Sequence, residues 1–92
     1  MKTIHKYPLQ VKQETLIPMN EHAQILTVQM QNQVPCLWVL TDTEKPLVTK
    51  AIELYGTGHD VPDSDTARTY IGTFQMHGGS LVFHVFERFI VC

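Results

Sequence analysis

The stretch GTFQMHGGSLVFHVFE, from Gly72 to Glu87, decides the fold of this chain. Two apolar runs flank a compact turn at Met76–Ser80, and its two consecutive glycines supply the positive φ angles that tight turns need. The runs on either side, Arg68–Met76 and Ser80–Ile90, therefore predict an antiparallel hairpin. The second run is apolar on both faces, which predicts a central or doubly covered strand. Its expected faces are Leu81, Phe83, Val85 and Phe89 on one side, and Val82, His84, Phe86 and Ile90 on the other.

A second hairpin is predicted upstream. Residues alternate between two faces through Gln24–Gln31 and again through Val34–Leu40, with the period of a β-strand. The polar link between the two runs indicates a hairpin loop, in which Asn32 is the residue best suited to a left-handed conformation. Pro35 cannot donate to a ladder, so it is expected at a strand start or on an edge. The expected faces are Leu26, Val28 and Met30 in the first run, opposite Ile25, Thr27, Gln29 and Gln31, and Val34, Cys36, Trp38 and Leu40 in the second.

The remaining segments complete an all-β pattern. Thr3–Leu9 is expected to be a strand that ends at Pro8, and Glu14–Ile17 a short strand that ends at Pro18. Leu47–Tyr55 is compatible with a strand or a short helix, and its strand-forming residues favour the strand. Gly56–Asp65 has the composition of a long loop. The sequence thus predicts one domain, residues 1–92, built as a small barrel or two-layer sandwich of five to seven mostly antiparallel strands.

Composition restricts the classes of function. The net charge is −2 and the seven basic residues are scattered, which disfavours sequence-specific DNA binding but leaves room for one small anionic ligand. There is no secretory signal at the N-terminus and no apolar run long enough to span a membrane, so a cytoplasmic protein is expected. Cys36 and Cys92 are expected to be free thiols in a reducing compartment.

Four separated blocks carry a resemblance. They are IHKYPL, ILTVQMQNQVPCLWVL, GTGH and YIGTFQMHGGSLVFHVFE, and they extend from Ile4 to Glu87. In this order they resemble a family of small proteins that are encoded in bacteriophage and prophage genomes and catalogued as a domain of unknown function. The resemblance implies a phage accessory protein that acts in the bacterial cytoplasm, and it implies no mechanism. Asn32-Gln33 stands where Asn-Gly would suit a type I′ turn better.

The block GTGH, Gly56–His59, has two interpretations. Two glycines around a threonine can expose successive backbone N–H groups and so form an anion nest, to which Thr57 would add a hydroxyl and His59 a switchable donor. The alternative is a tight turn between strands, in which glycine is needed only for its positive φ. No Gly-Lys-Ser/Thr follows, so the block is not a phosphate-binding P-loop.

Other chemistries find little support in the sequence. The cluster His59, Asp60, Asp63 and Asp65 matches no known metal-ligand spacing and is typical of a solvated acidic loop. Cys36 lies in an apolar run that lowers thiol reactivity, and no Gly-x-Ser-x-Gly elbow is present. Glu53 and Glu87 have no pattern that would bring their carboxylates together. We therefore predict no enzyme, no metal site and no cofactor.

The first strand of the Gly72–Glu87 hairpin carries an unusual face. Thr69, Ile71, Thr73 and Gln75 are expected on one side, opposite Tyr70, Phe74 and Met76. Such an uncharged, half-apolar face suits a second subunit or a ligand, so a homo-oligomer is predicted. The alternative is a covered core face with a few satisfied hydroxyls and amides. His84 is expected to be buried and hydrogen-bonded.

These observations lead to a functional hypothesis. A small oligomer would sequester a nucleotide-derived host immune signal at its subunit interface, with aromatic residues stacking the base and Arg68 or Lys50 pairing a phosphate. The alternatives are an inhibitor that binds a host restriction or CRISPR effector through a strand edge or the acidic loop Asp60–Asp65, and a minor virion or assembly protein. The predicted ligand-binding residues are Trp38, Tyr55, Gly56, Thr57, Gly58, His59, Arg68, Tyr70, Phe74 and Gln75.

Overall fold

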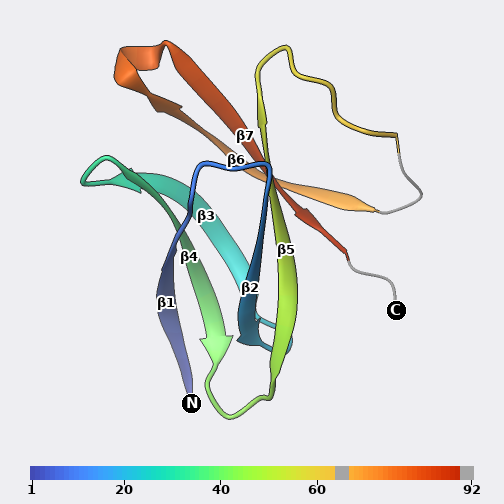
Figure 1. Cartoon of the computed structure of the whole chain (residues 1–92). Coiled ribbons are helices and arrows are strands. Elements are labelled where there is room, and N and C mark those ends of the chain that lie inside the picture. Colours follow the sequence, from blue (N-terminus) through green and yellow to red (C-terminus); the bar gives the residue numbers. More distant parts are fainter. Residues whose placement is uncertain (64–66, 90–92) are drawn as a thin grey trace.

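Two antiparallel sheets form the molecule. The computed structural model describes residues 1–63 and 67–89, so Asp65, Ile90 and Cys92 lie outside the described residues. One sheet has the strand order β1-β4-β3 and the other β2-β5-β7-β6, and the layers are open rather than closed into a barrel (Figure 1). The all-β prediction is therefore confirmed as a two-layer sandwich. The elements are β1 (Lys2–Pro8), β2 (Glu14–Asn20), β3 (Gln24–Gln31), β4 (Val34–Asp42), β5 (Leu47–Gly56), β6 (Arg68–Met76), the short 3-10 turn η1 (His77–Gly79) and β7 (Leu81–Arg88).

Both predicted hairpins are present. β3 pairs with β4, and β6 pairs with β7 across η1. The chain changes sheet between β1 and β2, between β2 and β3, and between β4 and β5, so the β3–β4 hairpin is nested between the paired strands β2 and β5 (Figure 1). β7 lies between β5 and β6, which confirms its predicted central position.

The core lies between the two sheets and follows strand alternation. Leu37 and Val39 of β4 are fully buried. They belong to the same buried cluster as Ile52 and Val85 of the four-stranded sheet. The predicted face with Trp38 is therefore the outer one. The buried cluster consists of Leu9, Ile17, Met19, Val28, Leu37, Val39, Ile52, Leu54, Phe74 and Val85.

A bulge in β3 corrects the face predicted for that strand. Ile25 pairs with Val39 and Thr27 with Trp38, so Leu26 is an extra residue without a partner. A bulge shifts the alternation by one residue. Leu26 consequently lies 44% exposed instead of sharing the buried face of Val28.

A second bulge corrects β6. Tyr70 pairs with Phe86 and Gly72 with Val85, which leaves Ile71 as the extra residue. Ile71 packs against the core, and Tyr70 shares the outer face with Thr73 and Gln75. The sequence predicted Tyr70 on the other face of the strand from Thr73, and Thr69 and Ile71 on the same face as Thr73. Both predictions were wrong because they assumed unbroken alternation.

Pro18, Pro35 and the segment Leu47–Tyr55 all lie in regular strands. β2 continues through Pro18 to Asn20, so the prediction that Pro18 ends this strand was wrong. β2 is an edge strand, where a missing N–H costs no ladder bond. Pro35 is the second residue of β4, as expected of a strand start. Leu47–Gly56 is a strand, which confirms the favoured interpretation.

The β3–β4 loop has the backbone of a type I′ turn. Asn32 has φ 50° and Gln33 has φ 67°, and this turn requires positive φ at both positions. The left-handed region costs a residue with a Cβ roughly 1–2 kcal/mol. The loop therefore tolerates glutamine at a position where glycine is preferred.

Gln33→Gly should raise the free energy of unfolding by roughly 0.5–1 kcal/mol, because part of the relieved strain is offset by the entropy of glycine in the unfolded chain. Urea denaturation would measure the change. Gln24→Gly, in the extended backbone of β3, is the matched control and should destabilise. A Gln33→Gly protein less stable than the parent would contradict the account of the turn.

Candidate functional site

Aromatic rings meet on the outer face of the four-stranded sheet. Register places Tyr70 of β6 beside Phe86 of β7, and Tyr55 of β5 beside His84 of β7. The Tyr70 and Phe86 rings meet edge to face with centroids 5.6 Å apart, and those of Tyr55 and Phe86 do so at 6.1 Å. Tyr70 is 57% exposed, whereas Tyr55 is buried. Tyr70 is therefore the ring of this set that is open to a ligand.

A chain of hydrogen bonds crosses the same face. The Tyr70 hydroxyl lies 2.6 Å from Thr73 Oγ1, which lies 3.0 Å from His84 Nδ1. His84 Nε2 in turn lies 2.8 Å from Thr57 Oγ1. A neutral imidazole donates at one nitrogen and accepts at the other, so the direction of the chain follows its tautomer. His84 is half-buried and hydrogen-bonded on both sides, close to the expectation for it.

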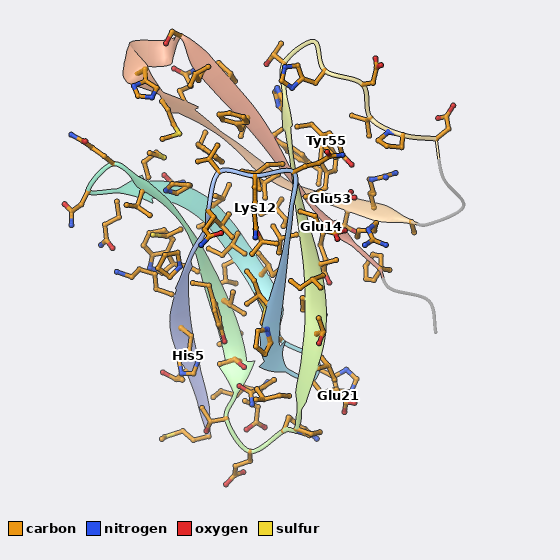
Figure 2. All side chains as sticks on the ribbon, in the orientation of Figure 1. His5, Lys12, Glu14, Glu21, Glu53 and Tyr55 are labelled. Carbon is orange, nitrogen blue, oxygen red and sulfur yellow. The ribbon has the colours of Figure 1, made fainter. Side chains whose placement is uncertain are left out.

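Charged side chains on this face are already paired. Arg68 Nε donates to Glu53 Oε1 at 2.6 Å, and Arg88 Nε lies 3.3 Å from Glu53 Oε2. Arg88 also contacts Glu14 of β2, which lies next to β5 (Figure 2). The hydrogen bond that Arg68 donates to Glu53 raises the pKa of Arg68, and the hydrogen bond that Arg88 donates to Glu14 raises the pKa of Arg88.

Both cations predicted to hold a phosphate therefore have partners. Arg68 bonds Glu53 and also donates to the Pro62 carbonyl oxygen at 3.1 Å. Lys50 lies 3.1 Å from Glu87. A phosphate at either position would have to displace a carboxylate.

Tyr55 is buried against Arg68. The guanidinium carbon lies 6.0 Å from the centre of the Tyr55 ring, and the buried hydroxyl has no hydrogen-bond partner among residues 1–63 and 67–89. Burial first, and the nearby Glu53 carboxylate second, raise the pKa of Tyr55 above its ordinary value of 10.0. Tyr55 thus packs against Phe86 beneath the exposed surface, and its buried ring is not accessible for a ligand to stack on.

Tyr55→Phe should retain or slightly raise stability at neutral pH, because it removes a buried hydroxyl without a hydrogen bond. The folded protein holds the phenolic proton more tightly than the unfolded chain, so stability falls as the pH rises above the ordinary value of 10.0. Tyr55→Phe should remove that part of the alkaline loss. Urea unfolding at about pH 8 and about pH 11 measures it, and identical losses in both proteins would contradict it.

The GTGH block has the geometry of a turn. Thr57 N donates to the Val82 carbonyl at 3.1 Å, and His59 N donates to the Gly56 carbonyl at 3.0 Å. Two of the amides expected to form an anion nest are therefore used within the fold, and the turn interpretation holds. Gly58 supplies the positive φ, 87°. At Gly56 a Cβ would lie 2.8 Å from the His59 ring.

The predicted site residues divide into two groups. Thr57, Tyr55, Arg68 and Tyr70 come together on the outer face, with the GTGH turn at its end and Gln75 further along β6. Phe74 is buried in the core, where its ring stacks on Phe83 at 5.5 Å. Trp38 lies on the other sheet, paired with Lys6 and Thr27. The structure therefore does not bring Phe74 and Trp38 together with the other predicted site residues.

Sequence reasoning missed Glu53, Phe86 and Arg88. Counting back from the hairpin turn would have placed Glu87 across from Tyr70, and the bulge at Ile71 brings Phe86 there instead. The pairing of Glu53 with two arginines depends on the long-range β5–β7 ladder and has no local signal. Within residues 1–63 and 67–89, no three His, Cys, Asp or Glu side chains gather in a way that could hold a metal ion. Over the same residues, no helix has the length and apolarity to cross a membrane.

Comparison with known proteins gives one match. Residues 1–90 match the model of a family described as a domain of unknown function, DUF7352. A search of curated proteins found no match, and a search of solved structures found none.

Proposed function

We propose, from the geometry of the outer face, that this chain, which belongs to the family described as a domain of unknown function, DUF7352, is a binding protein rather than an enzyme. The proposal is that it acts as a phage-type accessory protein in the bacterial cytoplasm. It would sequester a small nucleotide-derived host immune signal between two copies of the chain.

The exposed Tyr70 ring carries this proposal. Its edge-to-face contact with Phe86 and the hydrogen bond between its hydroxyl and Thr73 Oγ1 hold the ring in one orientation. A fixed aromatic ring stacks a nucleobase at low entropic cost, and such stacking contributes about 1–3 kcal/mol per base. The hydroxyl of Thr57 and the imidazole of His84 add donors and acceptors along the same face.

The charges on the face favour base recognition over phosphate recognition. Arg68 and Arg88 are balanced by Glu53 and Glu14. Glu14 is the more exposed of the two acids, so an incoming phosphate would exchange most easily with Glu14 for Arg88. A second copy is favoured by the exposed apolar side chains of the same sheet, which an interface would cover. These are Leu16, Leu47 and Tyr70.

Calorimetric titration with mononucleotides and cyclic dinucleotides tests the proposal. Tyr70→Ala should weaken binding at least tenfold, because the loss of one stacked base is worth about 1.4 kcal/mol or more. Tyr70→Phe keeps the ring and should bind within a few-fold of the parent. Phe89→Ala removes another exposed ring, 45% exposed against 57% for Tyr70, and should have no effect. No heat with any nucleotide would refute the proposal.

One observation favours a second candidate, an inhibitor that binds a host defence protein. β1 pairs only with β4 among the described strands, so its seven residues leave one edge open to an added strand. A pull-down with purified restriction and CRISPR effectors would test this. Ile4→Lys, at an exposed position of β1, should abolish capture, and capture unchanged by this variant would exclude the β1 edge.

A further inference from the structure

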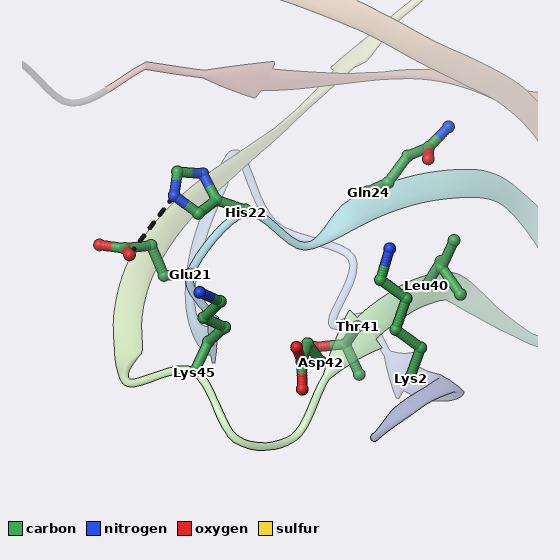
Figure 3. A pocket seen from close by; sticks show the side chains of 8 residues that line it. All are labelled: Lys2, Glu21, His22, Gln24, Leu40, Thr41, Asp42 and Lys45. Carbon is green, nitrogen blue, oxygen red and sulfur yellow. Dashed lines mark ion pairs between the residues drawn. The ribbon is translucent and has the colours of Figure 1, made fainter.

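A separate pocket of about 210 Å³ lies at the end of the molecule that carries the β2–β3 and β4–β5 turns (Figure 3). None of the predicted site residues lines it. The start of β1, the two turns and the end of β4 all contribute to its wall. The lining residues are Lys2, Glu21, His22, Gln24, Leu40, Thr41, Asp42 and Lys45.

The two carboxylates of the pocket contact donors that lie close to them. Asp42 Oδ1 accepts from the N-terminal ammonium and from the Glu44 backbone N–H, both at 3.1 Å. These contacts, the backbone N–H first, lower the pKa of the Asp42 carboxyl. Glu21 turns toward His22, with its carboxylate 3.4 Å from His22 Nε2 (Figure 3).

The two lysines of the pocket differ from Arg68, Arg88 and Lys50 of the fold. Arg68, Arg88 and Lys50 each contact a carboxylate. Lys2 and Lys45 make no ion pair within the described part of the chain, although Lys2 lies across from Asp42 in the β1–β4 ladder. Figure 3 shows their side chains rising on either side of the pocket. Two ammonium groups from different elements therefore border one hollow, whose carboxylates, Asp42 and Glu21, have their closest contacts with the N-terminal ammonium, the Glu44 N–H and His22.

Buried hydrogen bonds fix the turn that carries Lys45. Asn20 Nδ2 donates to the Lys45 carbonyl at 2.7 Å, and Thr41 Oγ1 donates to Asn20 Oδ1 at 3.0 Å. Asn20 and Thr41 are buried, so this network holds the turn in one position relative to both sheets. On the facing turn, His22 has φ 65°, a conformation better suited to glycine, and its side chain borders the pocket.

We propose that this pocket binds a small phosphate or phosphate-monoester group between Lys2 and Lys45. Their ammonium groups supply charge, and the Gln24 amide and His22 ring supply further donors around it. Phosphate fits better than a carboxylate because it carries more charge and accepts hydrogen bonds from several directions. The site is independent of the Tyr70 face and goes beyond the function proposed for it.

Titration of the full chain with inorganic phosphate, followed by amide NMR shifts at low and constant ionic strength, tests the proposal. Saturable shifts should gather at residues 20–24 and 40–46. Lys45→Gln and Lys2→Gln should each weaken binding at least fivefold. Lys12→Gln makes the same change of net charge on the exposed β1–β2 loop and is the matched control. The amide spectrum itself reports whether each variant is folded.

Three outcomes would overturn the proposal. They are an absence of saturable shifts, saturable shifts that gather elsewhere, and an equal loss in Lys12→Gln, which would indicate the general field of the protein instead of a built site. Tyr70→Ala should leave phosphate binding unchanged. This variant separates the present site from the proposed nucleotide face, so failure of one does not decide the other.

Discussion

Glu53→Ala should lower the free energy of unfolding by about 3 kcal/mol, because removal of one partner from a buried ion pair leaves charge uncompensated. The Glu53 side chain is only 8% exposed, and its carboxylate contacts the guanidinium groups of Arg68 and Arg88. The three side chains join β5, β6 and β7. The loss should therefore destabilise the sheet that carries the candidate site. Urea denaturation at neutral pH measures it.

Glu44→Ala is the matched control for this prediction. Glu44 is 84% exposed and lies 3.5 Å from the N-terminal ammonium, so its loss should change stability by well under about 1 kcal/mol. If Glu53→Ala and Glu44→Ala proved equally stable, the carboxylate of Glu53 would not hold the sheet together, and the account of the outer face would fail.

Gly72→Ala should destabilise the protein by about 2 kcal/mol through overpacking. A Cβ at Gly72 would lie 2.8 Å from Val28 Cγ1, at the place where β6 passes β3 of the other sheet. Val28 is buried and its β-branched side chain has little rotameric freedom. The two layers would have to separate locally to admit one methyl group. Thermal and urea unfolding both measure the loss.

Gly56→Ala provides an informative comparison. The added Cβ would come equally close, 2.8 Å, to the ring of His59, but that ring is exposed and can turn away. We expect a clearly smaller loss. The double variant Gly72→Ala, Val28→Ala should be more stable than the sum of the two single losses predicts, because the smaller side chain makes room. Simple additivity would contradict the steric explanation.

Much of the fold could be predicted because its signals are local. The glycines of the HGG turn, the alternation in Gln24–Gln31 and the polar Asn32-Gln33 link each depend on neighbouring residues. The pairings β1–β4 and β2–β5 join residues far apart in the chain and leave no mark in a short window. The sequence did not reveal the bulges at Leu26 and Ile71. Each extra residue reverses the face expected for every residue on one side of the bulge.

The candidate site was only partly predictable for the same reason. Tyr70 was expected to bind, and it does lie open, but its true neighbours follow from the Ile71 bulge. Arg68 was expected to meet a phosphate, whereas it meets Glu53, fifteen residues away in the sequence. The GTGH block has turn composition, and composition does not reveal that Val82 accepts the hydrogen bond of Thr57 N. Which charged side chains pair on a sheet face depends on the register between strands, and a local stretch of sequence does not show this register.

The nested position of the β3–β4 hairpin has a consequence for the route by which the chain folds. Its two-residue loop closes at small entropic cost, so its contacts can form early. Once formed, the hairpin brings its own two ends together, and these ends connect to β2 and β5. The stretch between Asn20 and Leu47 then no longer has to close as a free coil when β2 pairs with β5. We therefore expect the folding nucleus to include this hairpin. The left-handed residues Asn32 and Gln33 would then govern how fast the protein reaches its native state.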